Sequence, residues 1–215
     1  QGRLSREAGE DVGRYLINIG NLNELNPNYN CFITENKYYT IVKRDIKINE
    51  IKIETKTYDG TKNAIVEKCE VSNTVEGDDI NVDLSVEFTD VNVGERELKI
   101  LSSAIVGTKK DNYNLILDDT VFKARIIPKD VVVVAKEKES IFGDPIELEY
   151  ECKGLLDGER FEGSLEIDSN EVGIYIIKNK LSNLNYNIKY TSANYTIKQR
   201  EIKISAINVN KTYGD

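Results

Sequence analysis

The side chains on which most enzymes depend for proton transfer and metal binding are missing or isolated in this sequence. Its 215 residues contain no His, which is the commonest general base, metal ligand and member of catalytic triads. Cys31, Cys69 and Cys152 lie far apart and form no CxxC pair, so we expect neither a metal site nor a histidine-activated nucleophile. We expect three small, buried hydrophobic side chains, with at least one free thiol because their number is odd.

Pairs of carboxylates are the remaining groups that could do chemistry. Asp78-Asp79 and Asp118-Asp119 could offer oxygens to calcium, but neither pair has the spaced carboxylates of a dedicated loop, and we interpret both as solvated turns. Glu147 and Glu149 would share one face of a strand, which could suggest a glycosidase, but the alternating pattern favours the polar half of a strand. The sequence therefore predicts no catalytic activity and no catalytic, cofactor-binding or metal-binding residue, and it identifies no ligand-binding residue.

Tyrosines recur in two short motifs. The Gly-x-Tyr steps at Gly13–Tyr15 and Gly173–Tyr175 could present aromatic rings for surface recognition. The preferred interpretation is a strand whose tyrosine hydroxyl bonds to nearby backbone, as in the tyrosine corner of Ig-like sandwiches. Asn-Tyr-Asn at 28–30 and 185–187 favours a turn followed by the start of a strand over contacts to a sugar.

The charge balance narrows the range of partners. The formal net charge is −8, from 37 acidic and 29 basic residues, without a long block of one sign. Nucleic acids and anionic membranes both need a concentrated basic face, so we expect neither partner. The longest apolar run, Val131–Ala135, is far shorter than the ~18 residues that cross a bilayer, so we expect no membrane insertion by this segment. With no initial Met and no signal peptide, we expect an internal piece of a longer protein, whose export and anchor signals lie elsewhere.

Internal repeats indicate how the chain is organised. Residues 39–48 (YTIVKRDIKI) closely match residues 195–204 (YTIKQREIKI). Residues 126–144 align without gaps on residues 197–215, and both copies end in an aromatic residue followed by Gly-Asp. The first junction ends similarly, in Lys56–Gly60 (KTYDG). Each junction thus contains a strand-like segment, a basic–acidic step, a second strand-like segment and an aromatic turn.

These junctions and most other segments alternate apolar and polar residues with a period of two, which predicts half-buried strands. In the junctions the alternation is clearest at Ile46–Ile48 and Ile202–Ile204. The other alternating segments are Val82–Phe88, the segment from Val131 onward, Ile146–Tyr150 and Tyr186–Tyr190. Turn residues interrupt the pattern about every 8–12 residues, and no segment shows the apolar stripe of an amphipathic helix. The chain is therefore predicted to be all-β.

The combined motifs resemble the YDG-type and YGX-type (MBG) repeat domains of bacterial surface proteins and adhesins, over essentially the whole chain. The YDG-type motifs are Lys56–Thr61, Gly77–Asp79, Asp90–Gly94 and Asp111–Leu115. The YGX-type motifs are Phe142–Pro145, Gly154–Gly158, Gly163–Leu165, Asn170–Tyr175 and Asn185-Tyr186, with Gly2–Tyr15 as a further close match. The sequence departs from the usual pattern at Phe142, which replaces a tyrosine, and at Lys43 and Gln199, which stand where Pro128 occupies the other junction.

The resemblance implies four segments. Residues 1–45 would be the C-terminal half of a YGX-type repeat, 46–126 a YDG-type repeat, 127–203 a YGX-type repeat, and 204–215 the opening strand of a further repeat. We expect tandem sandwich-like units, with an Ig-like topology preferred and a β-grasp-like or otherwise open sheet as the alternative. No Gly/Ser-rich or Pro-rich spacer separates the units, so we expect them to form an elongated, semi-rigid rod.

The resemblance also implies an extracellular, structural role at the bacterial cell surface, without catalytic residues. We expect spacer or stalk repeats, as in an adhesin, whose partners are neighbouring repeats of the same protein. The alternative is a repeat that itself binds a host glycan or protein weakly and gains strength from many copies. Because residues 1–45 would be half a unit with exposed strand edges, we also expect edge-to-edge or swapped self-association that involves residues 205–215.

Overall fold

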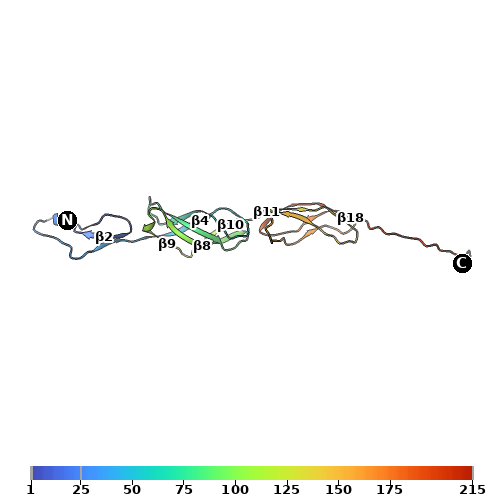
Figure 1. The fold of residues 1–215 in the computed structure, drawn as a ribbon, viewed down its shortest axis with the longest axis horizontal. Coiled ribbons are helices and arrows are strands. Elements are labelled where there is room, and N and C mark those ends of the chain that lie inside the picture. The colour runs from blue at the N-terminus through green and yellow to red at the C-terminus, as the bar shows by residue number, and fades with distance from the viewer. Residues whose placement is uncertain (1, 25, 215) are drawn as a thin grey trace. The chain divides into compact units, whose positions relative to one another are not determined.

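The computed structural model describes residues 2–24 and 26–214, and within these ranges β-strands are nearly the only regular structure (Figure 1). Strands β1 to β18 are joined by loops and by two single-turn 3₁₀ helices, η1 (Leu22–Glu24) and η2 (Lys110–Asn112). No helix in the described ranges has the length and apolar character needed to cross a bilayer. The prediction of an all-β fold is confirmed.

The chain forms two compact units. Unit 1 contains Gln1–Lys56 and Thr61–Ile126, and unit 2 contains Thr57–Gly60 and Ile127–Asp215. The short segment Thr57–Gly60, which carries the Tyr-Asp-Gly turn, thus belongs to unit 2 although the chain on both sides of it belongs to unit 1. The four segments predicted from the sequence describe how the repeats divide the chain, and this division stays a prediction.

Among the described residues, unit 1 is built on three sheets. The first is antiparallel, in the order β1 (Ser5–Arg6), β2 (Gly13–Asn18), β3 (Tyr38–Ile41). The second has the order β6 (Val66–Ser72), β4 (Arg44–Ile53), β9 (Tyr113–Ile116), with β4 antiparallel to β6 and parallel to β9. The third has the order β5 (Lys56–Thr57), β10 (Lys123–Ile127), β8 (Gly94–Val106), β7 (Asn81–Phe88).

The core of unit 1 lies between the second and third sheets. Ile46 and Ile48 are buried along β4, and a bulge after Ile48 shifts the inward face so that Ile51 is the next buried residue. Ile46 packs with Val82 of β7 and Tyr113 of β9. Two sheets that share one apolar layer form a sandwich, and the alternating strands predicted at the first junction and at β7 are confirmed.

Unit 2 also has a sandwich-like arrangement. One sheet has the order β13 (Tyr150–Lys153), β11 (Lys129–Ala135), β17 (Tyr186–Thr191), with β11 parallel to β17. The other has the order β12 (Lys138–Ile141), β18 (Asn194–Lys198), β15 (Gly173–Ile176), and a short pair is formed by β14 (Leu165–Glu166) and β16 (Lys178–Asn179). The buried residues between them are Val133, Ala135, Leu165, Ile177, Leu181, Tyr195 and Ile197. The strands predicted along β11 and β17 are confirmed.

Both units place their first long strand in the same way. In unit 1, Arg44 of β4 is paired with Tyr113 of the parallel strand β9. In unit 2, Lys129 of β11 is paired with Tyr186 of the parallel strand β17. Arg44 and Lys129 also occupy matching positions in the sequence repeats of the junctions. The repeat detected in the sequence is therefore a repeat in structure.

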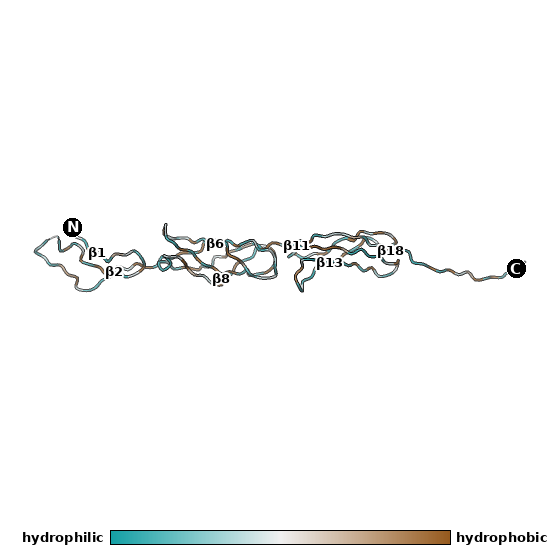
Figure 2. The backbone as a smooth tube through the Cα atoms, turned by 45° about the horizontal axis from the view of Figure 1, so that its top comes forward, coloured by the Kyte–Doolittle hydropathy of each residue, from teal (hydrophilic) through white to brown (hydrophobic). Residues whose placement is uncertain are grey.

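The C-terminal segment differs from the prediction. Residues 199–214 contain no strand, and Ile202 and Ile204 are 80% and 91% exposed, so the half-buried strand predicted at Ile202–Ile204 is wrong. The alternation itself is present, as the colours along this segment in Figure 2 show. A strand also needs neighbouring strands and a core to cover, and the described part of the chain supplies neither to this segment.

The alternating segment Ile146–Tyr150 is a strand only at its end. β13 begins at Tyr150, and residues 145–149 belong to no strand, so the prediction is wrong for most of the segment. Pro145 stands at its start and has no N–H to donate to a neighbouring strand. The Lys136 N–H does donate to the Glu149 carbonyl (2.9 Å), but the ladder is not continued toward Pro145.

Candidate functional site: a tyrosine–carboxylate cluster in each unit

In unit 2, two tyrosines share one carboxylate. The Tyr186 hydroxyl donates to Glu159 Oε2 (2.5 Å) and accepts from the Leu156 N–H (3.1 Å). The Tyr58 hydroxyl donates to Glu159 Oε1, its N–H donates to the Ile127 carbonyl (2.9 Å), and the two rings meet edge to face with centroids 5.5 Å apart. Tyr58 and Tyr186 are only 5% and 6% exposed. Hydrogen bonds to a charged acceptor are stronger than neutral ones, so Glu159 holds both rings in place.

Local turns position these side chains. Tyr186 is the first residue of β17, and its N–H donates to the carbonyl of Asn183 (3.0 Å) in the turn before the strand. The Glu159 N–H donates to the Leu156 carbonyl (3.2 Å). Gly158, with φ of 81°, lets this turn adopt a backbone conformation that other residues rarely take. The turn therefore brings the Leu156 N–H and the Glu159 carboxylate to the same tyrosine hydroxyl.

The ionisation of these tyrosines is strongly suppressed. Burial raises the pKa of Tyr58 and of Tyr186 to about 12, and the hydrogen bonds to Glu159 act in the same direction. Removing the phenolic proton would place a second negative charge beside the carboxylate in a poorly solvated site. Both hydroxyls therefore stay neutral donors at physiological pH, and the cluster acts as a structural clamp.

Unit 1 contains the same arrangement. The Tyr113 hydroxyl donates to Asp78 Oδ2 (2.5 Å) and accepts from the Val75 N–H (2.9 Å). Asp78 follows Gly77, which has φ of 87°, just as Glu159 follows a glycine. Burial raises the pKa of Tyr113, which is 2% exposed, and the hydrogen bond to Asp78 raises it further. In each unit, a carboxylate and a backbone N–H hold the tyrosine that starts the parallel strand.

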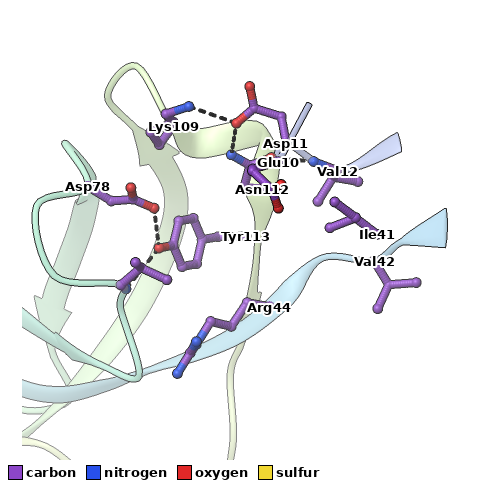
Figure 3. Close-up of a pocket in the computed structure, with 11 residues that line it drawn as sticks. Glu10, Asp11, Val12, Ile41, Val42, Arg44, Asp78, Lys109, Asn112 and Tyr113 are labelled. Atoms are coloured by element: carbon purple, nitrogen blue, oxygen red, sulfur yellow. Dashed lines mark hydrogen bonds and ion pairs between the residues drawn. The ribbon is translucent and has the colours of Figure 1, made fainter. Parts of the chain in front are cut away.

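Beside Tyr113 lies an open pocket of about 260 Å³ within unit 1 (Figure 3). Tyr113 and Asp78 form one side of it, and Val12, Ile41 and Val42 lie on the opposite side. Its walls thus come from the loop before β7, from the turn before β2 and from the connection between β3 and β4.

A hydrogen-bonded network closes the pocket on the side of helix η2. The Asp11 carboxylate accepts from Lys109 Nζ (2.7 Å) and Asn112 Nδ2 (2.6 Å), while the Val12 N–H donates to Asn112 Oδ1 (2.7 Å) (Figure 3). The hydrogen bond from Lys109, followed by the one from Asn112, lowers the pKa of Asp11. This network links the turn before β2 to the loop that leads into β9.

The Gly-x-Tyr tyrosines behave as predicted. The Tyr15 hydroxyl donates to the Asp11 carbonyl (2.6 Å), and the Tyr175 hydroxyl donates to the Glu171 carbonyl (3.0 Å). In both cases the acceptor lies four residues before the tyrosine. The interpretation of these tyrosines as strand residues tied to nearby backbone is confirmed.

The Asn-Tyr-Asn motifs have different outcomes. At 185–187 the predicted turn and strand start are confirmed, since β17 begins at Tyr186. At 28–30 the motif begins in a turn, but the next strand does not start until Tyr38, so the predicted strand start is wrong there. The long connection between β2 and β3 contains no second pairing strand among its described residues.

Acidic residues that could have suggested chemistry form hydrogen bonds or ion pairs with neighbouring residues. Asp118 accepts hydrogen bonds from Thr120, and these contribute most to lowering its pKa to about 2. Glu147 and Glu149 both form ion pairs with Lys138. The described ranges contain no group of three His, Cys, Asp or Glu side chains arranged to hold a metal ion.

The cysteines are less buried than expected. Cys152 is exposed, and Cys31 and Cys69 are only partly buried, so the expectation of three buried side chains is wrong. Cys152 lies on β13 at the edge of its sheet, and Cys31 lies in the long connection after β2, where no second sheet covers it. Burial raises the pKa of the Cys69 thiol, which packs against the unit 1 core.

The two clusters themselves were missed by reasoning from the sequence. The prediction that Asp78 lies in a solvated turn is wrong, because its half-buried carboxylate holds Tyr113. A signal was present: an apolar residue, an acidic residue, a glycine and a carboxylate recur in Val75–Asp78 (VEGD) and Leu156–Glu159 (LDGE). Asn-Tyr-Asn also recurs at 112–114.

Comparison with known families agrees with this repeated architecture. Residues 42–121 match the YDG domain, and residues 131–196 match the MBG domain (YGX type). No curated protein and no solved structure gives a significant match to the chain. Each matched stretch contains a tyrosine held by a carboxylate, Tyr113 by Asp78 and Tyr186 by Glu159, at the start of a strand that pairs in parallel with the first long strand of its unit. The chain therefore carries a YDG domain and an MBG domain of the YGX type in tandem.

Proposed function

We propose that this chain is a spacer in the stalk of a bacterial cell-surface protein, that it lies outside the cell, and that it has no catalytic activity. MBG-type domains are typical of surface proteins. The observation that best supports a spacer is the path of the chain, which crosses between the two units at three points. These crossings are Lys56 to Thr57, Gly60 to Thr61, and Ile126 to Ile127.

Three covalent crossings restrict motion more than one linker does. Domains joined by a single flexible linker are expected to move independently. Here the Thr57–Gly60 segment is anchored in unit 2 by the hydrogen bonds of Tyr58 to Glu159 and Ile127, and the third crossing is followed directly by Pro128. These features support a semi-rigid connection, which a spacer needs in order to hold a more distal part of a protein away from the cell.

Rotational diffusion tests this mechanical role. We expect ¹⁵N relaxation to give one common correlation time for both units of the intact chain. Tyr58→Ala should make the two correlation times diverge, because it releases the segment that contributes two of the crossings. Tyr29→Ala, at a position that is 71% exposed, is the matched control and should leave them equal. Independent tumbling of the unaltered chain would contradict the spacer role.

The location of the chain outside the cell and its lack of catalytic activity are tested separately. Antibodies against this chain should label intact cells of the source bacterium, and labelling that requires permeabilised cells would argue against surface exposure. The purified chain should show no hydrolysis of glycan, peptide or ester substrates above buffer. Turnover that survives repurification would reject the view that the chain has no catalytic activity.

Exposed aromatic side chains favour a second candidate function, weak binding of a host glycan or protein. Tyr29, Phe32 and Tyr39 in unit 1 are 71%, 75% and 52% exposed. Binding to glycan arrays and matrix proteins should then be stronger for a tandem array of copies than for one chain, and Phe32→Ala should weaken it. Absence of binding in both formats would leave the spacer role alone.

A further inference from the structure

In unit 2, two long segments of the chain lie side by side and run in the same direction. They are the entry segment, residues 129–141, which contains β11 and β12, and the exit segment, residues 186–198, which contains β17 and β18. β11 is parallel to β17 at six paired positions, and β12 is parallel to β18 at four. Because β11–β17 and β12–β18 belong to different sheets, the parallel pairing of the two segments passes through both layers of the sandwich.

The direction of these segments decides how unit 2 responds when the chain is pulled. The entry segment begins at Lys129 and the exit segment ends at Lys198, and β11 and β18 lie toward opposite ends of the unit (Figure 1). Tension on the chain before Lys129 and after Lys198 therefore pulls the two segments past each other along their length. Hydrogen bonds between parallel strands are evenly spaced and cross from one strand to the next, so this pull loads all the paired positions together and not one after another.

Polar contacts join the two segments near Lys129, where tension enters the unit. The Lys129 N–H donates to the carbonyl of Asn185, just before the exit segment (3.0 Å). The Asp130 carboxylate accepts from Asn187 Nδ2 (2.8 Å) and from Lys189 Nζ (2.6 Å). The hydrogen bond from Lys189, followed by the one from Asn187, lowers the pKa of Asp130 and keeps it charged. Each of these contacts spans the two segments that the pull would separate.

Further contacts join the segments near Lys198, where tension leaves the unit. Lys198 forms an ion pair with Glu139 of β12 (2.6 Å), and its carbonyl accepts from the Phe142 N–H (2.8 Å). Beyond the exit segment, Arg200 donates to the Phe142 carbonyl (2.7 Å) and forms an ion pair with Asp144. Exposed ion pairs each add little to equilibrium stability. Together with the backbone hydrogen bonds, however, they hold the two segments in one register at both ends.

We propose that the entry and exit segments form a shear clamp, which makes unit 2 resist tension along the chain far more strongly than a pull that peels the segments apart. Forced unfolding is governed by the unfolding rate and not by equilibrium stability, so the clamp can act in a unit of ordinary stability. Unit 1 begins with the same parallel pairing, of β4 with β9. The use of the clamp in a cell rests on the proposed stalk role, in which the chain transmits traction. Rotational diffusion tests that role and pulling tests the clamp, so either can fail without the other.

A matched pair of substitutions separates the clamp from the core beneath it. Ile177 and Ile197 are both buried in the same core cluster, but only Ile197 lies on the exit segment. Ile177→Val and Ile197→Val make the same small change in a buried side chain and should lower the urea midpoint by similar amounts. When tension is applied at positions 129 and 198, Ile197→Val should speed unfolding about threefold or more, and Ile177→Val should change the rate much less. Equal acceleration by both would contradict the clamp, because the resistance would then come from the core as a whole.

Pulling the full chain in two directions tests the clamp directly. Handles attached through non-natural side chains at positions 129 and 198 shear the two segments, whereas handles at positions 141 and 198, which lie opposite each other, peel them apart from one end. Urea midpoints of both labelled chains are measured first, so that any difference in equilibrium stability is taken into account. At the same constant force, unfolding should be at least about tenfold faster under peeling, because shearing must break several hydrogen bonds together. Equal unfolding rates in the two directions would overturn the proposal.

Discussion

Glu159 is the residue on which the Tyr58 contact depends. Its two oxygens accept from two different phenols, and the Tyr58 and Tyr186 rings then pack edge to face. Asp78 fills the same role in unit 1 but accepts from only one described tyrosine, Tyr113. A single carboxylate thus fixes the start of the parallel strand in each unit, and in unit 2 it also fixes the Tyr-Asp-Gly turn.

Replacing this carboxylate should destabilise unit 2. In Glu159→Gln, one side-chain oxygen is replaced by an NH₂ donor, so one buried tyrosine hydroxyl loses its acceptor. We expect the free energy of unfolding to fall by about 1–3 kcal/mol, the usual effect of leaving a buried polar group unsatisfied. Urea denaturation followed by tyrosine fluorescence measures this. Glu137→Gln, on the exposed surface, removes the same charge and should have little effect; an equal loss in both variants would contradict the role of Glu159.

The stability of unit 2 should fall at alkaline pH. The pKa values of Tyr58 and Tyr186 are raised from 10.0 to about 12 in the folded chain, so the folded state holds these protons more tightly than the unfolded state does. Their contribution is complete below pH 10 and is lost as the pH rises from 10 to 12. Urea midpoints across this range measure the decline. Tyr58→Phe should make it shallower, and an identical slope would show that Tyr58 does not contribute.

At the level of elements, the same sequence pattern forms a buried strand at one place in the chain and an exposed segment without a strand at another. Ile46 in β4 is fully buried, whereas Ile202, at the matching position of the junction repeat, is 80% exposed. β4 lies between β6 and β9, and residues 199–214 pair with no described strand. Pairing partners, and not the alternation alone, decide whether the pattern becomes a buried strand.

Equivalent substitutions at these two positions should have very different effects. Ile46→Ala removes buried methyl groups from the unit 1 core and should lower the free energy of unfolding by about 2–5 kcal/mol. Ile202→Ala changes an exposed side chain and should stay within about 0.5 kcal/mol. Chemical denaturation of both variants checks this. A large loss in Ile202→Ala would mean that the C-terminal segment is packed in solution.

The same contrast explains what the sequence could predict. The hydrogen bond from Tyr175 to Glu171 spans four residues and follows from a local motif, so it was predicted. The hydrogen bond from Tyr58 to Glu159 spans 101 residues and depends on which strands become neighbours, which periodicity does not encode. Strands such as β7 and β17 were predictable because their residues alternate along a buried sheet face. The two clusters were not, because their polar partners meet only after the sheets have formed.

At the level of the whole chain, family matches and compact units divide the residues differently. The YDG match covers residues 42–121, yet Thr57–Gly60 from this stretch belongs to unit 2. Unit 2 is therefore completed by an aromatic turn that precedes its own stretch of sequence.

Making different connections between the units flexible should reduce the coupling of their rotational motion by different amounts. A flexible Gly-Ser spacer inserted after Pro128 loosens only the last crossing, because Thr57–Gly60 stays anchored by Tyr58. Tyr58→Ala loosens the two crossings on either side of that segment. We therefore expect the correlation times of the two units, measured by ¹⁵N relaxation, to differ more in Tyr58→Ala than in the spacer variant, and most when both changes are combined. If the spacer alone makes the units tumble independently, the connector between β10 and β11 provides the coupling and the anchored turn does not.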